Sequence, residues 1–169
     1  MAVAAIAATG ALVSTAVAAD EIVLGSAISF TKNYSLNGIH TKNGYDLAVK
    51  RINQMGGVKV DGKSYKLRIK YYDDESDPKR TAQLVERLIK QDGIKYMLGP
   101  YSLATTKAAA VVTEKYKVPM VETEGASRSL FTQGYNYLFA VLSTSEQYLA
   151  SSVALAAEIA SNKGKSRVT

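Results

Sequence analysis

The chain has no cysteine and no tryptophan, and only one histidine and three prolines among its 169 residues. The lack of cysteine excludes disulfides, a thiolate nucleophile and a cysteine-ligated zinc site. The single histidine, His40, cannot form a multi-histidine metal site, and we expect it on a helix surface rather than in the role of a base. No metal and no cofactor are therefore predicted.

The basic residues are dispersed, although the formal net charge is +6 at pH 7. No block of Lys and Arg is longer than Lys79-Arg80, and acidic residues lie between the basic ones. This distribution is typical of a solvated surface, so no nucleic-acid partner is predicted. Apolar residues make up 47% of the chain and charged residues 21%, which fits a globular protein of one domain, or of one domain and part of another.

The first 19 residues carry no charge, are rich in Ala and Val, and end in Ala16-Val17-Ala18-Ala19. An apolar stretch followed by a small-x-small site predicts a signal peptide over residues 1–19, and hence export to the periplasm. No basic residue precedes the apolar stretch, so either the true start lies upstream or Met1 is internal to a longer leader. A buried alanine-rich helix is the alternative. No other segment reaches the roughly 18 apolar residues that span a bilayer.

Strand and helix patterns alternate after the leader. Strands are predicted at 21–28, 65–72, 94–98, 118–121 and 137–142, with one more beginning at 166–169; helices are predicted at 38–55, 78–93, 105–117 and 145–162, and a turn at 60–63. This alternation predicts an α/β fold, a parallel sheet flanked by helices. Ligands bind beyond the carboxyl ends of such strands, so the candidate loops are 29–37, 73–77, 99–105 and 122–128.

The loop from Gly99 to Thr106 is not a nucleotide-binding loop. No second glycine precedes Lys107, as the P-loop requires, and residues 25–44 contain no G-x-G-x-x-G pattern. What remains is a helix N-terminus with hydroxyl side chains, which favours an anion. The alternative is that Ser102 or Thr105 simply caps its own helix, and the loop alone leaves both interpretations open.

The acidic run DDESDP, residues 73–78, lacks the spacing of a calcium loop. We expect solvated charges there, with Asp77 as the N-cap of a helix that begins at Pro78. Glu122 and Glu124 lie at the carboxyl end of a predicted strand, where they either face a ligand or pair with Arg128.

No nucleophile–base pair is apparent in the sequence. Ser102 would need a histidine, but His40 lies in a different crossover and no third member can be identified. No catalytic residue is therefore predicted, and the protein is not expected to be an enzyme.

Five stretches carry a resemblance to a known family: EIVLGSAIS, NGYDLAVKRINQMGGV, YYDDESDPKRTAQLVERLIKQDGIKYMLGP, YSLATTKAAAVVTEKYKVPMV and GASRSLFTQGYNYLFAV. The pattern D-D-x-x-D-P-x-x-A followed by G-P-Y-S is specific in combination. Residues 21–169 resemble the N-terminal part of the periplasmic solute-binding proteins of ABC importers, of the branched-chain amino acid (leucine/isoleucine/valine) type.

The resemblance implies a type I periplasmic-binding-protein-like fold, in which two α/β lobes close on a ligand. Residues 20–141 would form a nearly complete N-terminal lobe, and residues 142–169 the hinge crossing and the start of a truncated second lobe. The implied partners are a small amino-acid-like, amide or aromatic-acid ligand and the permease subunits of an ABC importer, with the full-length protein a monomer. The alternative is a ligand-sensing domain of a receptor or regulator with the same fold.

The resemblance also implies the binding residues. The loop after the third strand of the family holds the ligand carboxylate, and the loop after the fourth strand contributes further polar groups. Leu103 replaces a serine and Ala126 a threonine of the leucine-binding members, so we expect a ligand other than a standard branched-chain amino acid. Glu124 would select an amine or amide. The implied ligand-binding residues, including an aromatic wall of three, are Tyr101, Ser102, Leu103, Ala104, Thr105, Glu124, Gly125, Ala126, Phe30 and Tyr34.

Overall fold

The computed structural model describes residues 20–164, so the predicted signal peptide and the strand predicted at 166–169 lie outside the described residues. The strands are β1 (Glu21–Ile28), β2 (Val58–Val60), β3 (Lys63–Asp73), β4 (Tyr96–Leu98), β5 (Met120–Glu122) and β6 (Leu138–Ala140). The helices are α1 (Ser35–Gln54), α2 (Pro78–Lys90), α3 (Leu103–Tyr116) and α4 (Ala150–Asn162), with short 3-10 turns at Lys32–Tyr34, Arg128–Leu130 and Ser145–Gln147.

The six strands form one sheet in the order β2-β3-β1-β4-β5-β6. Strands β3, β1, β4, β5 and β6 are parallel neighbours, which confirms the predicted α/β fold. Strand β2 is antiparallel to β3, so the sheet is mixed rather than wholly parallel. The predicted turn joins these two strands through Asp61 and Gly62, whose φ angles are 50° and 80°. The sequence prediction missed β2 because a strand of three residues is too short to show a period.

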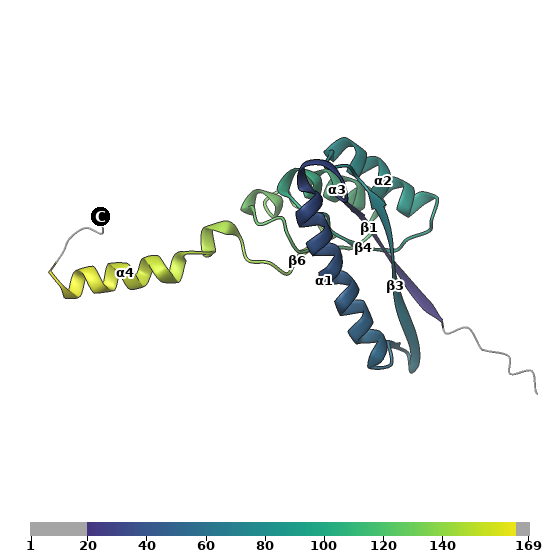
Figure 1. Ribbon diagram of the computed structural model, residues 1–169, viewed down its shortest axis with the longest axis horizontal. Helices are drawn as coiled ribbons and strands as arrows, with labels where there is room; N and C mark the ends of the chain where they lie inside the picture. The colour runs from purple at the N-terminus through teal and green to yellow at the C-terminus, as the bar shows by residue number, and fades with distance from the viewer. Residues whose placement is uncertain (1–19, 165–169) are drawn as a thin grey trace, which may run out of the picture.

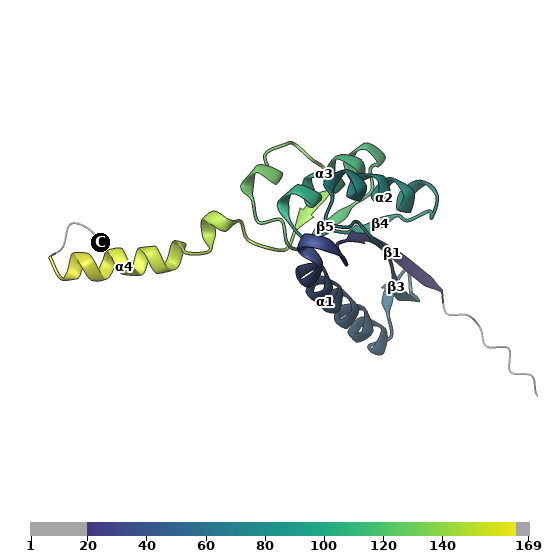
Figure 2. The same cartoon turned by 45° about the horizontal axis from the view of Figure 1, so that its top comes forward.

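Helices α2 and α3 lie together on one face of the sheet, and α1 lies on the other (Figures 1 and 2). The core lies under α2 and α3 and consists of the buried side chains Ala27, Val85, Leu88, Ile94, Met97, Ala109, Ala110, Val118 and Met120. Strand β5 shows the alternation that this layering requires. Met120 is fully buried in the core, whereas Val121 points to the opposite face and is 36% exposed.

On the face that carries α1, part of the sheet stays open. An apolar groove there is lined by Ile22, Leu24, Val58, Val60, Leu67, Tyr96, Met97, Leu98, Pro119 and Val121. Helix α1 packs mainly over β3, so it does not cover the side chains that β4 and β5 present to this face. The groove is therefore a second surface of the described chain, separate from the loops at the strand ends.

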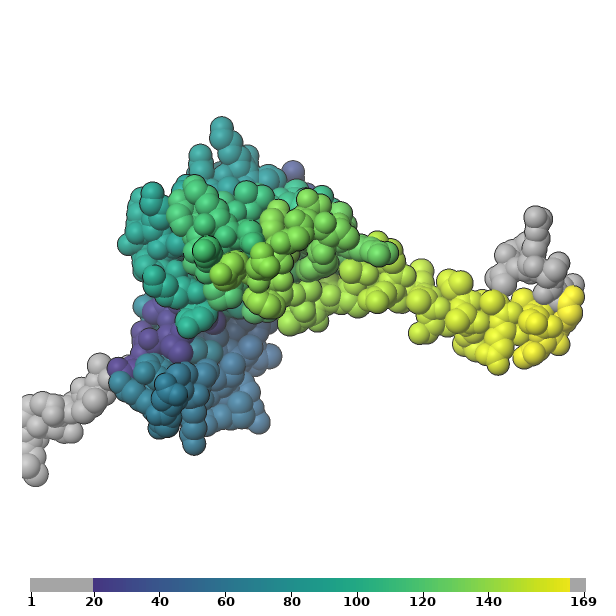
Figure 3. Space-filling model, turned by 180° about the vertical axis from the view of Figure 1, so that it is seen from behind, coloured from purple at the N-terminus to yellow at the C-terminus, as the bar shows by residue number. Residues whose placement is uncertain are grey.

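Helix α4 extends away from the body of the fold (Figures 1 and 3). The predicted helix at 145–162 is interrupted, because a 3-10 turn occupies Ser145–Gln147 and the α-helix begins only at Ala150. Leu149, Val153 and Leu155 are more than half exposed. Within residues 20–164, none of the helices combines the length and apolar character needed to cross a membrane.

Two helices begin earlier than predicted, which shortens two candidate loops. Helix α1 begins at Ser35 and α3 at Leu103, so the loops they follow end at residues 34 and 102. In α1 the apolar pattern is visible only from Ile39, but Gly38 lies in the first turn and packs directly on the loop. A Cβ at Gly38 would be 1.8 Å from the carbonyl oxygen of Ser29, so this contact depends on glycine.

Candidate functional site

Four loops meet at the carboxyl edge of the sheet, as parallel strands require. They follow β1, β3, β4 and β5 and comprise residues 29–34, 74–77, 99–102 and 123–127. Polar contacts join the loops in two pairs. The first pair consists of the loops after β1 and β3, and the second of the loops after β4 and β5.

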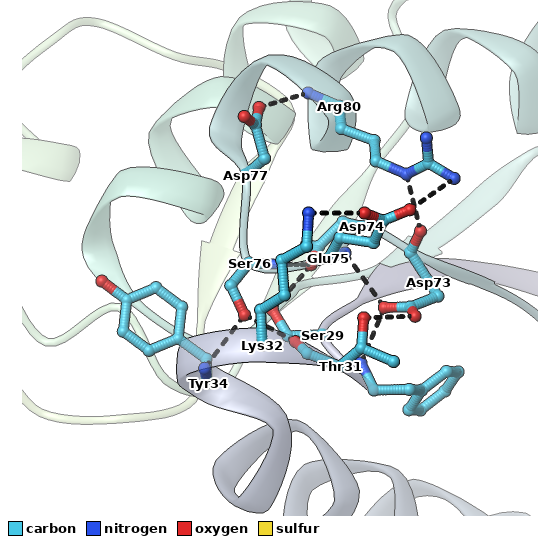
Figure 4. A network of polar contacts seen from close by, with 11 residues as sticks. Ser29, Thr31, Lys32, Tyr34, Asp73, Asp74, Glu75, Ser76, Asp77 and Arg80 are labelled. Carbon is cyan, nitrogen blue, oxygen red and sulfur yellow. Dashed lines mark hydrogen bonds and ion pairs between the residues drawn. The ribbon is translucent and has the colours of Figure 1, made fainter.

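The carboxylate of Asp74 joins the first pair (Figure 4). Asp74 is completely buried. Its Oδ1 accepts hydrogen bonds from Ser29 Oγ at 2.6 Å and from Ser76 N at 2.9 Å, and its Oδ2 accepts one from Thr81 Oγ1 at 2.9 Å. The expectation of a solvated charge is therefore wrong at this position, because three donors compensate for the loss of water.

Asp73, the last residue of β3, also connects the loops after β1 and β3. It accepts hydrogen bonds from Phe30 N at 2.9 Å and Thr31 Oγ1 at 2.8 Å, and from the N–H of Glu75 at 3.0 Å. Partial burial alone would raise the pKa of the Asp73 carboxyl, but the backbone and hydroxyl donors outweigh it and lower that pKa below its ordinary value. Ser76 completes the contact, since its Oγ donates to Thr31 O at 2.8 Å.

The end of the acidic run behaves as predicted. Asp77 is exposed and has extended backbone angles, and its Oδ1 accepts a hydrogen bond from Arg80 N at 2.8 Å. Pro78 is the first residue of α2, which confirms the predicted cap. Glu75 forms ion pairs with Lys32 at 2.7 Å and with Arg80 at 3.2 Å. No cluster that could hold a metal ion exists within the described part of the chain.

Ser102 is the N-cap of α3, in agreement with the interpretation that a hydroxyl side chain of this loop caps its own helix. Its Oγ accepts a hydrogen bond from Thr105 N at 3.4 Å, and the buried Thr105 hydroxyl donates back to the carbonyl of Tyr101. The backbone of Ser102 has φ 82° and ψ 153°, a region that is almost reserved for glycine and costs about 1–3 kcal/mol for other residues. The cap leaves the first two N–H groups of the helix, those of Leu103 and Ala104, without an intrahelical partner. An anion can still bind there.

Glu122 and Glu124 differ in environment. Glu122 is completely buried, and its carboxylate accepts hydrogen bonds from Thr106 Oγ1 at 3.0 Å and from Gly125 N. Burial raises the pKa of Glu122 above its ordinary value. Glu124 is only partly buried and accepts a hydrogen bond from Thr41 Oγ1 at 3.4 Å. Neither forms the ion pair with Arg128 that the sequence left open, within the residues that the structure describes.

Tyr45 joins the second pair of loops from α1. Its hydroxyl donates to Gly99 O at 2.8 Å and lies 2.7 Å from Thr123 Oγ1. Burial raises the pKa of Tyr45, so the hydroxyl keeps its proton for these bonds. Tyr45 cannot be recognised as a site residue from the sequence, because its helical spacing indicates only a core position.

The three residues of the predicted aromatic wall do not lie together, because Phe30 is separate from Tyr34 and Tyr101. The rings of Tyr34 and Tyr101 meet edge to face, with centroids 5.6 Å apart, and connect the two pairs of loops. Phe30 instead packs edge to face on Tyr71 in β3, at 5.8 Å.

The remaining predicted residues differ in exposure, which bears on how each could meet a ligand. Leu103, at 37% exposure, and Ala104 lie open at the N-terminus of α3. In the loop after β5, Gly125 is buried and Ala126 is partly exposed. Leu103 and Ala104 therefore have a free approach from solvent, whereas Gly125 can offer only its backbone.

Replacing Asp74 tests the contact between the first two loops. Asp74→Ala removes the acceptor of three donors, two of them buried, so we expect the free energy of unfolding to fall by about 3 kcal/mol. Asp77→Ala is the matched control, because it removes only an exposed cap and should cost about 1 kcal/mol. Urea unfolding followed by circular dichroism measures both. Equal losses for the two variants would show that Asp74 has no special role.

The backbone of Ser102 gives a second test. Ser102→Ala loses the cap, at about 1 kcal/mol, and keeps the strained conformation. Ser102→Gly loses the same hydroxyl but relieves the strain, so it should be about 1 kcal/mol more stable than Ser102→Ala. The same unfolding assay compares them, and a glycine variant less stable than the alanine variant would contradict the strain.

Comparison with known proteins agrees with this geometry. A family model described as periplasmic binding protein matches residues 21–169. The leucine-specific-binding protein of Salmonella typhimurium is 32% identical over 96 residues, which cover 57% of this chain and 25% of that protein. A Leu/Ile/Val-binding protein homolog of Brucella abortus is 30% identical over 141 residues, or 83% of this chain and 34% of the relative. The chain thus spans between a quarter and about a third of these relatives.

Solved structures show the same fold. A branched-chain amino acid transporter substrate binding protein of Streptococcus pneumoniae, in complex with isoleucine, has a TM-score of 0.66 and 26% identity over 74% of this chain and 34% of its own. A solute binding protein of an ABC transporter from R. palustris, in complex with 4-hydroxybenzoate, has a TM-score of 0.64 and 26% identity over 86% of this chain and 37% of its own. The chain belongs to the periplasmic binding protein family, and its sheet with the flanking helices α1, α2 and α3 matches one lobe of that fold.

Proposed function

We propose that the chain is part of the solute-binding subunit of an ABC importer, a non-enzymatic protein that captures a small ligand and presents it to the permease. Family membership and the names of the relatives support this function. The observation that carries it is the N-terminus of α3, where the N–H groups of Leu103 and Ala104 lie at the carboxyl edge of the sheet. Such a position suits the carboxylate of an amino acid or an aromatic acid.

The ligand class follows from the side chains around this helix end. Leu103 and Ala126 offer no hydroxyl, so at these two positions only the backbone can supply polar contacts. Tyr34 and Tyr101 give an aromatic surface beside the helix end. We infer that the ligand is an amino-acid-like compound, an amide or an aromatic acid. One relative binds isoleucine and another binds 4-hydroxybenzoate, so the fold accommodates both kinds of acid.

Glu124 is the side chain that discriminates between these classes of ligand. It is the acidic side chain of the loop after β5 whose carboxylate is only partly buried, and a single hydrogen bond from Thr41 Oγ1 leaves it capacity to accept more. A carboxylate in this place attracts an amine or amide and repels a second acid group. We therefore favour a ligand that carries a donor near its acid group.

The arrangement of the chain fits capture between two lobes. We propose that residues 1–19 direct export to the periplasm, that residues 20–141 are the first lobe, and that residues 142–169 cross a hinge into a second lobe. The extension of α4 away from the sheet supports this division (Figure 3). With its second lobe we expect the protein to be a monomer that closes on its ligand.

A thermal-shift screen tests the ligand class on the protein expressed from its full reading frame. The panel contains leucine, isoleucine, phenylalanine, an amide such as leucinamide, and 4-hydroxybenzoate. A ligand at about 100 times its Kd should raise Tm by several degrees.

Matched variants locate the selectivity in this screen. Glu124→Ala should reduce the shift given by amine or amide ligands, and Glu86→Ala, on α2 and away from the loops, should leave it unchanged. The proposal fails if leucine alone stabilises the protein and Glu124→Ala does not diminish that effect.

A further inference from the structure

The carboxylate of Glu122 bonds the first turn of α3, which follows one loop of the second pair, and the backbone of the other loop. Glu122 is the last residue of β5, on the face covered by α3, and is completely buried. Its Oε2 accepts from Thr106 Oγ1, in the first turn of α3, at 3.0 Å. Its Oε1 accepts from Gly125 N, in the loop after β5. The side chain of Glu122 thus connects the N-terminal turn of α3 to the backbone of the loop after β5.

Two glycines bring the loops close to this residue. A Cβ at Gly99 would be 3.1 Å from Cα of Glu122, and a Cβ at Gly125 would be 2.8 Å from its Oε2. Gly125 would also come within 2.6 Å of Leu130 Cδ1. Both loops therefore pack directly against Glu122, so its position determines how far apart they lie.

A purely structural role explains this carboxylate poorly. A buried acid without a cation is costly, and within residues 20–164 no Lys, Arg or His forms an ion pair with Glu122. An apolar residue at the end of β5 would fill the same space without that cost. What the acid adds is two directed acceptors, one used by Thr106 in α3 and the other by Gly125 in the loop after β5.

We propose that Glu122 is a positioning residue that fixes the spacing between the N-terminus of α3 and the loop at 123–127, and so the geometry of ligand binding. The proposal rests on the proposed function for the identity of the site. Glu122 itself does not contact the ligand, because its side chain is enclosed by the sheet, α3 and Gly125.

The contacts predict which substitution is tolerated. Glutamine can keep the bond from Gly125 N through its oxygen and donate its NH₂ to Thr106 Oγ1. The Thr106 hydroxyl can then turn to Pro100 O, which lies 3.3 Å away. Alanine loses both contacts. Glu122→Gln should therefore retain the loop geometry that Glu122→Ala destroys.

Amide hydrogen exchange on the 169-residue chain tests the inference without any ligand. In Glu122→Ala we expect exchange at the Gly125 amide and at the first turn of α3 to rise by about tenfold or more. Exchange in α2, for example at Leu88, should not change. Glu122→Gln should stay within about threefold of the original protein at every site.

Thr106→Val is a second variant in case Glu122→Ala does not fold. It removes one of the two donors and should loosen the same segments. Its control is Thr113→Val in the same helix, since the buried Thr113 hydroxyl bonds only Ala110 O, at 3.1 Å, within α3. Unchanged exchange at Gly125 in Glu122→Ala, a uniform increase across the chain, or equal effects of the two threonine variants would each overturn the inference.

Ligand affinity gives the second readout, measured on the full reading frame with isoleucine and 4-hydroxybenzoate as probes. Glu122→Ala should weaken the probe that binds by about tenfold, and Glu122→Gln should restore most of that affinity. If neither probe binds the original protein, the panel compound that stabilises it most replaces them. If no compound of the panel binds, the proposed ligand class fails, and the exchange result still decides the role of Glu122. Equal affinity of the alanine variant and the original protein would refute the positioning role.

Discussion

Two buried carboxylates, Asp74 and Glu122, hold the carboxyl edge of the sheet together. A carboxylate removed from water is stable only when other donors replace the solvent. Neither residue has a cationic partner within the described chain, so hydroxyl and backbone N–H groups supply the donors. Each acid bonds a donor in its own loop, Ser76 or Gly125, and a donor from a distant segment, Ser29 or Thr106. Satisfying each acid therefore ties its own loop to that distant segment. The order of the whole edge depends on this requirement.

The contacts that shape this part of the candidate site come from the chain itself. The loop after β4 is held from one face of the sheet by Tyr45 and from the other by the contact between Thr106 and Glu122. Ser102 keeps a backbone conformation that serine rarely adopts, and its capping bond to Thr105 helps to maintain it. A preformed loop loses little entropy on binding, which favours affinity for a small ligand.

Local signals predicted the elements, whereas the contacts between loops could not be predicted. The cap at Asp77 and the strand at 21–28 follow from a few adjacent residues, and both are present in the structure. The burial of Asp74 depends on Ser29, 45 positions away, and the role of Tyr45 depends on Thr123, 78 positions away. Such pairings arise only from the order of strands in the sheet. For the same reason the acidic run at 73–78, whose composition predicts solvated charges, contains the buried Asp74.

Among the described residues, a small molecule could bind at the loops of the carboxyl edge or in the apolar groove on the open face of the sheet. We expect the ligand to bind at the loops. Chemical-shift mapping by NMR, during titration with the compound that stabilises the protein most, distinguishes the two surfaces directly. The largest changes should occur at the amides of Leu103, Ala104 and Gly125. Changes concentrated at Leu24, Leu98 and Val121, with the start of α3 unaffected, would contradict this expectation.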